Sequence, residues 1–301
     1  MISPLNTDDE RFLTALGQIN NRLTKAQRET SSGKRLLDVS DDPDQVTSLL
    51  LARASLARVQ QVQTNLGRIK TETDAAEVAV SNSVKIMERA RVLATQALNG
   101  TQTADTRAAI ASEVTNLVQQ LVNASNTWVN GRYVFSGDAD QTAAFTFSTT
   151  PTLTVSAYQG AAATRLALHT AGNTFEISKA GGEVFSNIDP TKNAFAALTS
   201  LHSALIANDP AAISQAMSDI TSSDNHLNQM LAWYGAAQNR VAKAVDTAAK
   251  TELNLKTQIG QTEDADMTEA LLEMNRAAFQ QQVALSSRGS VPRRSLFEYM
   301  G

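Results

Sequence analysis

The chain has 301 residues, with 26 basic and 30 acidic side chains and a formal net charge of -4. This near balance gives no electrostatic reason to expect nucleic acid or an anionic membrane as a main partner. The absence of cysteine excludes disulfides, thiol catalysis and thiolate metal sites. No signal peptide or membrane-length apolar run is visible, so composition alone predicts a cytosolic protein.

The first predicted helix covers residues 8–30 and carries one narrow apolar stripe. At spacings of four, three and four, the stripe contains Phe12, Leu16, Ile19 and Leu23. A stripe this narrow needs a partner helix to be shielded from water. The glycine of Ser31-Ser32-Gly33 is suited to end the helix, and residues 34–42 are expected to form a connection.

A second, long helix is predicted from Pro43, a residue favoured at the first helical position, to about residue 98. Its apolar seam comprises Val62, Leu66, Ile69, Thr73, Ala76, Val80 and Met87. Asn99-Gly100 ends this helix and Asp105 opens a third. The predicted seam of the third helix comprises Ile110, Val114, Leu117, Leu121, Ala124 and Trp128.

The hydrophobic period changes after the third helix, and we interpret residues 132–186 as a small β-rich insert. Short strand-like runs, separated by Gly, Asp, Pro or Thr, occur at residues 132–135, 145–147, 153–155, 165–168 and 174–177.

Helices resume at Asp189-Pro190 and again at Asp209-Pro210, where each proline is expected at the first helical position. The helix that begins near Pro210 keeps its apolar register to Ile259. Glu263-Asp264-Ala265-Asp266 is expected to cap a last helix. The apolar seam of this last helix comprises Met267, Leu271, Met274, Ala278 and Leu285, interrupted by Gln281.

The sequence therefore predicts a mainly α fold with a β-rich insert, in which long helices from both termini form a bundle or coiled coil. Both termini should lie at the same end of the bundle, since the insert is an excursion from it.

No catalytic, cofactor or metal site is expected. His169, His202 and His226 lack the spacing of metal ligands. The stretch 32–35 lacks the glycine and the Ser or Thr of a phosphate-binding loop. The acidic residues 263–266 are explained more simply by helix capping than by a divalent cation.

Several stretches resemble the flagellin superfamily and, within it, the hook-associated protein 3 family. Residues 31–35 with 39–43 are similar to a stretch of that family, and Lys34 and Pro43 favour it over the flagellins. Residues 87–94 with 99–101 resemble a segment shared across the superfamily. Residues 130–137 resemble the stretch at which that family's chain leaves its helical domain and enters its outer domain. Residues 295–301 resemble the family's C-terminal end. Ile2 departs from the usual arginine, and the insert matches only in outline.

The resemblance implies a structural protein, not an enzyme: copies of the chain would form a ring between the hook-side junction protein and the flagellin filament. It also implies a division into inner segments at residues 1–40 and 266–301, a helical middle domain at 41–131 and 187–265, and an outer domain at 132–186. It implies export through the flagellar type III apparatus without a cleaved signal, which replaces the cytosolic expectation with an extracellular, flagellar location. It also implies an export chaperone that binds the C-terminal amphipathic segment.

The two end seams are the expected contact surface for neighbouring copies and for the chaperone. The candidate residues are Phe12, Leu16, Ile19, Leu23, Met267, Leu271, Met274, Phe279 and Leu285. Arg89 and Arg91 are further candidates for contacts between subunits, against the simpler interpretation of a solvated helix face. We expect the ends to become ordered on assembly, and whether they also pair within one chain is left open.

Three alternative functions are weighed. A filament flagellin would share the architecture and differ in copy number. A type III translocator should contain a bilayer-entering apolar segment, which is not visible. An enzyme that uses the insert is the least favoured alternative, because its polar residues form no recognisable set.

Overall fold

The structure is a computed structural model that describes residues 6–36, 38, 42–150, 152–170 and 172–290. Its contacts divide the chain into two compact units. Unit 1 combines Met1–Ala57 with Glu252–Gly301, and unit 2 is Arg58–Thr251. The fold is mainly helical with a small strand-containing insert, as predicted.

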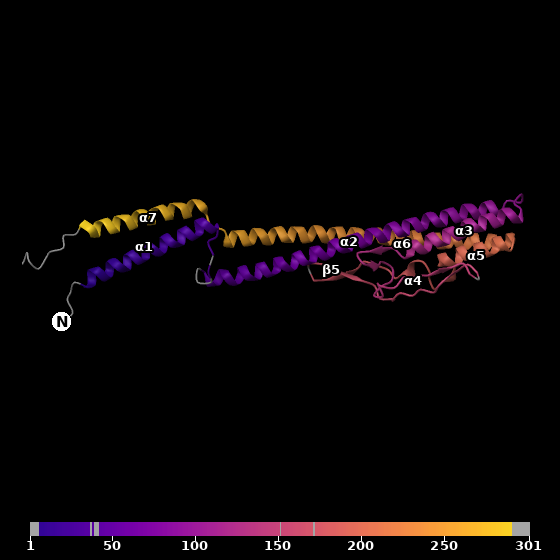
Figure 1. The fold of residues 1–301 in the computed structure, drawn as a ribbon, viewed down its shortest axis with the longest axis horizontal. Coiled ribbons are helices and arrows are strands. Elements are labelled where there is room, and N and C mark those ends of the chain that lie inside the picture. Colours follow the sequence, from indigo (N-terminus) through magenta and orange to yellow (C-terminus); the bar gives the residue numbers. More distant parts are fainter. Residues whose placement is uncertain (1–5, 37, 39–41, 151, 171, 291–301) are drawn as a thin grey trace, which may run out of the picture. The chain divides into compact units, whose positions relative to one another are not determined.

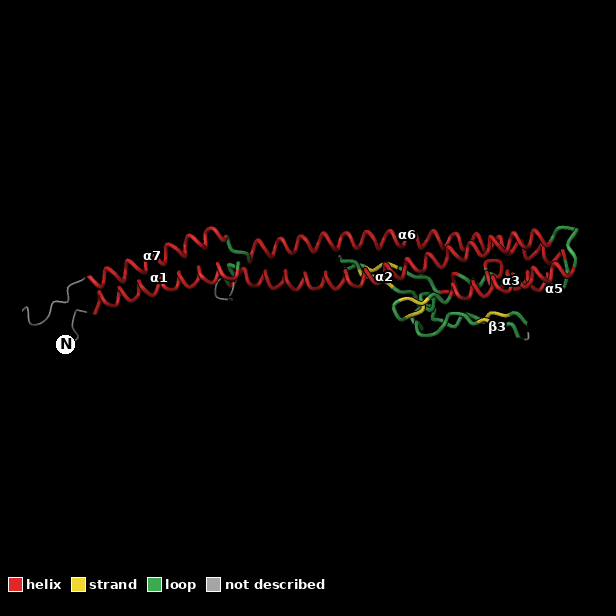
Figure 2. The backbone as a smooth tube through the Cα atoms, turned by 45° about the horizontal axis from the view of Figure 1, so that its top comes forward, coloured by secondary structure: helices red, strands yellow, loops and turns green. Residues whose placement is uncertain are grey.

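Unit 1 is built on the two end helices, which lie side by side in Figures 1 and 2. These are α1 (Asn6–Ser32) and α7 (Met267–Ser290). The unit also contains the beginning of α2 (Pro43–Ala97) and the end of α6 (Pro210–Glu263). The predicted helix boundaries at Pro43 and Pro210 are confirmed.

Unit 2 is a helical bundle with the insert against it (Figure 2). Its helices are the remaining parts of α2 and α6 together with α3 (Ala104–Ser125) and α5 (Ala194–Ile206). The predicted α2 seam is buried at Leu66, Val80 and Met87, and Tyr234 of α6 is fully buried in the same unit. Here the heptad pattern identifies the core.

Among the described residues, three two-stranded antiparallel sheets lie in the insert and the segment directly before it. They pair β1 (Trp128–Val129) with β2 (Arg132–Tyr133), β3 (Phe147–Ser148) with β4 (Thr154–Val155), and β5 (Leu166–Leu168) with β6 (Thr174–Glu176). A short helix α4 (Gly181–Val184) and the 3-10 helix η1 (Pro190–Lys192) lead to α5.

An aromatic cluster joins the insert to the bundle. The Phe135 ring lies edge-on to Phe185 at 5.0 Å and to Tyr234 at 6.2 Å between centroids. The Tyr234 hydroxyl accepts a hydrogen bond from the Lys179 backbone N–H at 3.2 Å. Complete burial raises the pKa of Tyr234, so this hydroxyl stays protonated.

The predicted place of Trp128 in the α3 seam is wrong. Helix α3 ends at Ser125, and the Asn126 side chain bonds both backbone groups of Phe145. Asn130 and Gly131, both at positive φ, form the two-residue turn between β1 and β2. Trp128 is therefore a half-exposed strand residue, with its ring 4.6 Å from Tyr133.

A buried arginine joins three helix ends in unit 2. The Arg107 Nε of α3 donates to the Ala97 carbonyl at the end of α2 at 2.9 Å. Its Nη1 donates to Asn208, in the turn between α5 and α6. The α2 carbonyl, which has no partner within its own helix, is satisfied by this contact.

Candidate functional site

The paired end helices of unit 1 are the candidate functional site. Helices α1 and α7 run antiparallel: Gln281 Nε2 donates to Asn20 Oδ1 at 2.8 Å, and Asp9 pairs with Arg288. Arg22 bonds Gln280 and also lies 3.6 Å from a Glu273 oxygen. The question whether the two ends pair within one chain is thereby answered.

Small side chains form the buried line of this pair. Ala26 of α1 and Ala270 and Ala277 of α7 are buried hydrophobic residues of the two helices. On α7 these positions continue to the half-buried Met274 and Gln281, so the inward line follows a heptad-like spacing. Because alanine offers little apolar area, the pair within one chain buries less than leucine-rich packing would.

The structure places the sequence-predicted contact residues in two groups. Half-buried in the pair are Phe12, Leu16, Ile19, Leu23 and Met274. Exposed are Met267, Leu271, Phe279 and Leu285. The predicted α7 seam thus lies beside the line that faces α1, and most of its large side chains remain outside the pair.

Helix α7 carries exposed apolar residues on two separate flanks. One flank, at spacings of four and fourteen, contains Met267, Leu271 and Leu285. The other contains Phe279, which is 68% exposed, with Leu272 and Val283, two residues that the sequence analysis missed. A helix that is apolar on several sides is typical of a buried position, so α7 has more apolar surface than α1 covers.

A surface groove follows the second flank. It has a volume of about 820 Å³ and lies between α1 and α7. Phe279 and Val283 line its α7 side, and Ala15, Ile19 and Arg22 line its α1 side. Its lining combines apolar side chains with polar ones such as Gln18 and Gln280, which suits an amphipathic helix.

At the end of the pair where α1 ends and α7 begins, hydrogen bonds join the two connecting segments. We call this contact the latch. Gly33, at φ +70°, ends α1. The Arg35 N–H then donates to the Glu263 carbonyl at 2.7 Å, and the Ala265 N–H donates to the Gly33 carbonyl at 2.9 Å. These bonds bring the two connections together in a short antiparallel bridge.

The Glu263 carboxylate lies buried at the centre of this latch. It pairs with Lys34, and Arg53 donates to its Oε2 at 2.5 Å. Burial opposes ionisation, but the two cations outweigh it and hold the pKa of Glu263 below its usual value. The carboxylate therefore remains charged at neutral pH.

The neighbouring Asp266 caps the N-terminus of α7. Asp266 Oδ1 accepts from the backbone N–H groups of Thr268 and Glu269, at 2.8 and 3.2 Å. In the part of the chain that the structure describes, no group of His, Asp or Glu could hold a metal ion, and no helix is long and apolar enough to cross a membrane.

The two candidate arginines of unit 2 differ in their surroundings. Arg89 donates through Nε and Nη2 to Glu113 Oε1 at 2.8 and 2.6 Å, on an exposed surface. Arg91 lines a surface hollow of about 560 Å³ with Val92 and Met217. Burial raises the pKa of nearby Asp224, and Arg91 opposes that rise.

Family models match both helical portions of the chain. The model of the bacterial flagellin N-terminal helical region matches residues 6–140, and that of the C-terminal helical region matches residues 211–290. These two ranges together cover more than half of the 301 residues.

Individual relatives agree with these models. The flagellar hook-associated protein 3 of Escherichia coli K12 is 35% identical over 124 residues, covering 40% of this chain and 38% of that protein. Flagellin A of Helicobacter pylori is 31% identical over 134 residues, covering 44% of this chain and 26% of that protein. The chain thus spans about two-fifths or less of these relatives' lengths.

A solved structure supports the fold. A flagellar hook-associated protein from Vibrio parahaemolyticus superimposes with a TM-score of 0.65 at 18% identity. The superposition covers 74% of this chain and 100% of that structure. At this identity the likeness concerns the fold.

The latch predicts acid sensitivity in unit 1. Because the folded-state pKa of Glu263 is lowered, its contribution to stability is present above the ordinary glutamate pKa and is lost as pH falls through the lowered value. Protection of the Arg35 and Ala265 amides against hydrogen exchange should therefore fall on acidification. Glu263→Gln should reduce this protection at neutral pH and make it depend less on pH.

The matched control is Glu273→Gln, which removes an exposed ion pair between α1 and α7 in the same unit. Surface pairs contribute about 1 kcal/mol or less, so protection at the latch should hardly change. Equal effects of the two substitutions would show that the Glu263 pairing has no special role.

Proposed function

Because the chain belongs to the bacterial flagellin family, we propose that it is a structural subunit of the flagellum that forms the junction ring between hook and filament. Its partners are then further copies of itself, the hook-side junction protein and flagellin. The observation that carries the proposal is the pair of exposed apolar flanks on α7, which need contacts from outside the chain.

The proposed mechanism assigns the two sides of the end helices to different tasks. The alanine line brings α1 and α7 together within one chain. The flanks that contain Leu271 and Phe279 are then buried by neighbouring subunits. Because each flank gains its full burial only when several copies meet, isolated pairs of subunits are disfavoured and ring formation is cooperative.

The proposed layout follows the sequence boundaries. Residues 1–40 and 266–301 form the inner layer of the ring, residues 41–131 and 187–265 its middle layer, and residues 132–186 its outer surface. Arg89 and Arg91 are proposed to reach neighbouring subunits through the middle layer. For Arg91 the support is its position at an open surface hollow.

Export through the flagellar type III apparatus, without cleavage of a signal, is the proposed route to this extracellular location. Before assembly the exposed side chains of α7 would promote premature association. We therefore propose that an export chaperone covers the flank containing Met267, Leu271 and Leu285. An amphipathic helix of this kind is suited to binding in a groove of its partner.

The less supported alternative, a filament flagellin, rests on the similarity to Flagellin A of Helicobacter pylori. Position on the flagellum separates the two functions. Gold-labelled antibody against this protein should mark a single band at the boundary of hook and filament. Labelling along the whole filament would identify a filament subunit, and absence of label from intact flagella would contradict both proposals.

A substitution on the exposed flank should separate folding from assembly. Leu271→Asp should abolish incorporation into flagella, because the aspartate would have to be buried between subunits without a partner. The circular dichroism of the purified protein should change little, since Leu271 is 42% exposed in the single chain. Asn254→Asp, which adds the same charge at an exposed polar position of α6 in the same unit, away from both α7 flanks, is the control. Normal incorporation of the Leu271 variant would contradict the role of this flank.

The alanine pair should be the least stable part of the free chain. Ordering the backbone costs about 1–2 kcal/mol per residue, which this narrow seam offsets only in part. In the monomer, amides of residues 10–30 and 270–288 should therefore exchange faster than those of residues 76–97. They should become protected in the assembled flagellum. Equally strong protection in the free protein would exclude ordering on assembly.

A further inference from the structure

A single buried carboxylate connects the insert to the long helix α2 in unit 2. Glu72 is 5% exposed, on the same stretch of α2 as the buried Thr73 and Ala76. A buried carboxylate is costly unless it is paired and hydrogen-bonded. The residues that pair with Glu72 therefore indicate its structural role.

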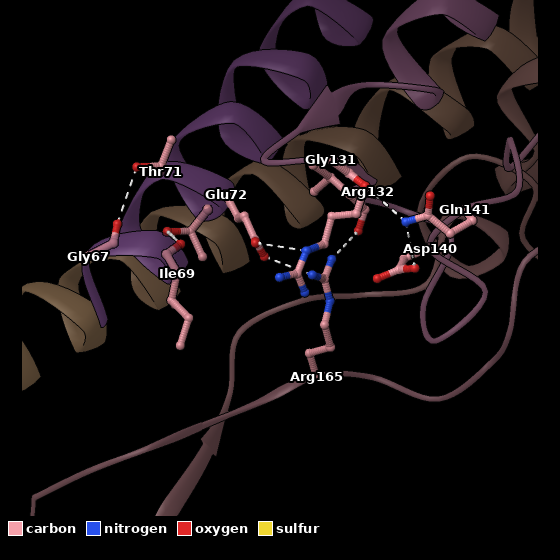
Figure 3. Close-up of polar contacts among 11 residues, drawn as sticks. Gly67, Ile69, Thr71, Glu72, Gly131, Arg132, Asp140, Gln141 and Arg165 are labelled. Carbon is pink, nitrogen blue, oxygen red and sulfur yellow. Dashed lines mark hydrogen bonds and ion pairs between the residues drawn. The ribbon is translucent and has the colours of Figure 1, made fainter. Parts of the chain in front are cut away.

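Both partners are arginines of the insert (Figure 3). Arg132, in β2, places its Nε 3.3 Å from Glu72 Oε1. Arg165, directly before β5, donates from Nη1 to Glu72 Oε2 at 2.8 Å. Two segments far apart in the sequence thus meet on one side chain of α2.

Arg165 is hydrogen-bonded to the segment after β2 and to the residues that follow β6. Its Nη2 donates to the Val134 carbonyl at 3.1 Å, in the segment that follows β2. Its backbone N–H donates to the Ser178 hydroxyl at 3.1 Å, and its carbonyl accepts from the Ile177 N–H at 3.2 Å. The guanidinium is therefore coupled to both sides of the hairpin.

The hairpin itself is weakly packed against α2. Leu166 and Leu168 are exposed, and Ala167 is the buried residue of β5. A hollow of about 540 Å³, lined by Leu66 and Ile69 of α2 and by Leu166, remains beside it. Apolar burial at this place contributes less than in a close-packed core, so the ionic contact matters more.

We propose that the β5–β6 hairpin, from Thr164 to Ser178, can move relative to α2 and is held there by the contact between Arg165 and Glu72. We call this contact the lock and the hairpin the strap. With the lock closed, the insert has one orientation on the bundle. With it open, the hairpin swings away and uncovers Leu66 and Ile69, while the aromatic cluster keeps the rest of the insert in place. Glu72 is thus a positioning residue for the outer surface of the molecule.

Limited proteolysis tests the lock directly, because trypsin cleaves after arginine. In Glu72→Gln, cleavage after Arg165 should be at least tenfold faster than in the wild type, since the side chain loses its ionic partner. Glu113→Gln is the matched control, because it removes an exposed carboxylate that pairs with Arg89 in the same unit. Its cleavage pattern should remain that of the wild type.

Amide exchange distinguishes a local strap from a general loss of stability. Amides of residues 166–176 should exchange at least tenfold faster in Glu72→Gln, while those of residues 76–97 remain unchanged. If the whole of unit 2 exchanges faster, Glu72 merely stabilises the fold and the proposal is wrong. Unchanged cleavage and exchange would also overturn it.

A second substitution keeps the test valid if Glu72→Gln does not fold. Arg165→Gln leaves Glu72 paired with Arg132 and removes the contacts of the Arg165 guanidinium with Glu72 and with the Val134 carbonyl. It should accelerate exchange in residues 166–176 to the same extent, with residues 76–97 protected. Wild-type exchange in this variant would show that Arg165 does not hold the hairpin.

Discussion

The narrow alanine line between α1 and α7 is the constraint on which the proposed assembly depends. Ala26, Ala270 and Ala277 fill the buried positions of the two helices, whereas Leu271 and Phe279 remain exposed. If the larger side chains occupied the inward line, the pair would be more stable and have less to offer a neighbour. Weak pairing within the chain and the proposed association between chains are therefore two consequences of the same distribution of side chains.

Unit 2 shows the opposite distribution. Met87, Leu121, Leu198 and Tyr234 are fully buried, and the aromatic rings of the insert complete the core. This unit forms a continuous apolar core within one chain, and its exposed apolar side chains, such as Trp128 and Leu166, lie outside that core. The long helices thus take part in two kinds of packing, one around a core and one as a pair with exposed flanks. The unit 2 core combines alanines with large side chains such as Leu121 and Tyr234, whereas the buried hydrophobic residues of α1 and α7 are alanines, although the helical period is common to both units.

Sequence reasoning identified the helices, the insert and the α2 seam, because periodicity over many residues averages out local exceptions. It misplaced Trp128, since the apolar spacing continues past the helix end that Asn126 and the Asn130-Gly131 turn impose. On α7 it found the apolar side chains but not which line faces α1. That choice depends on the partner helix, which periodicity does not describe. Glu72 and Arg165 are far apart in the sequence and gave no local signal of their contact.

Three buried charged residues lie where apolar packing cannot define position along a helix. A heptad seam permits shifted pairings of similar apolar burial, whereas a charge has few places where it can be satisfied. Glu263 meets Lys34 and Arg53 where the end helices break, and Arg107 meets the ends of α2 and α5. Glu72 does the same for the insert. We interpret these contacts as the features that fix register in each unit, whereas apolar seams supply most of the burial.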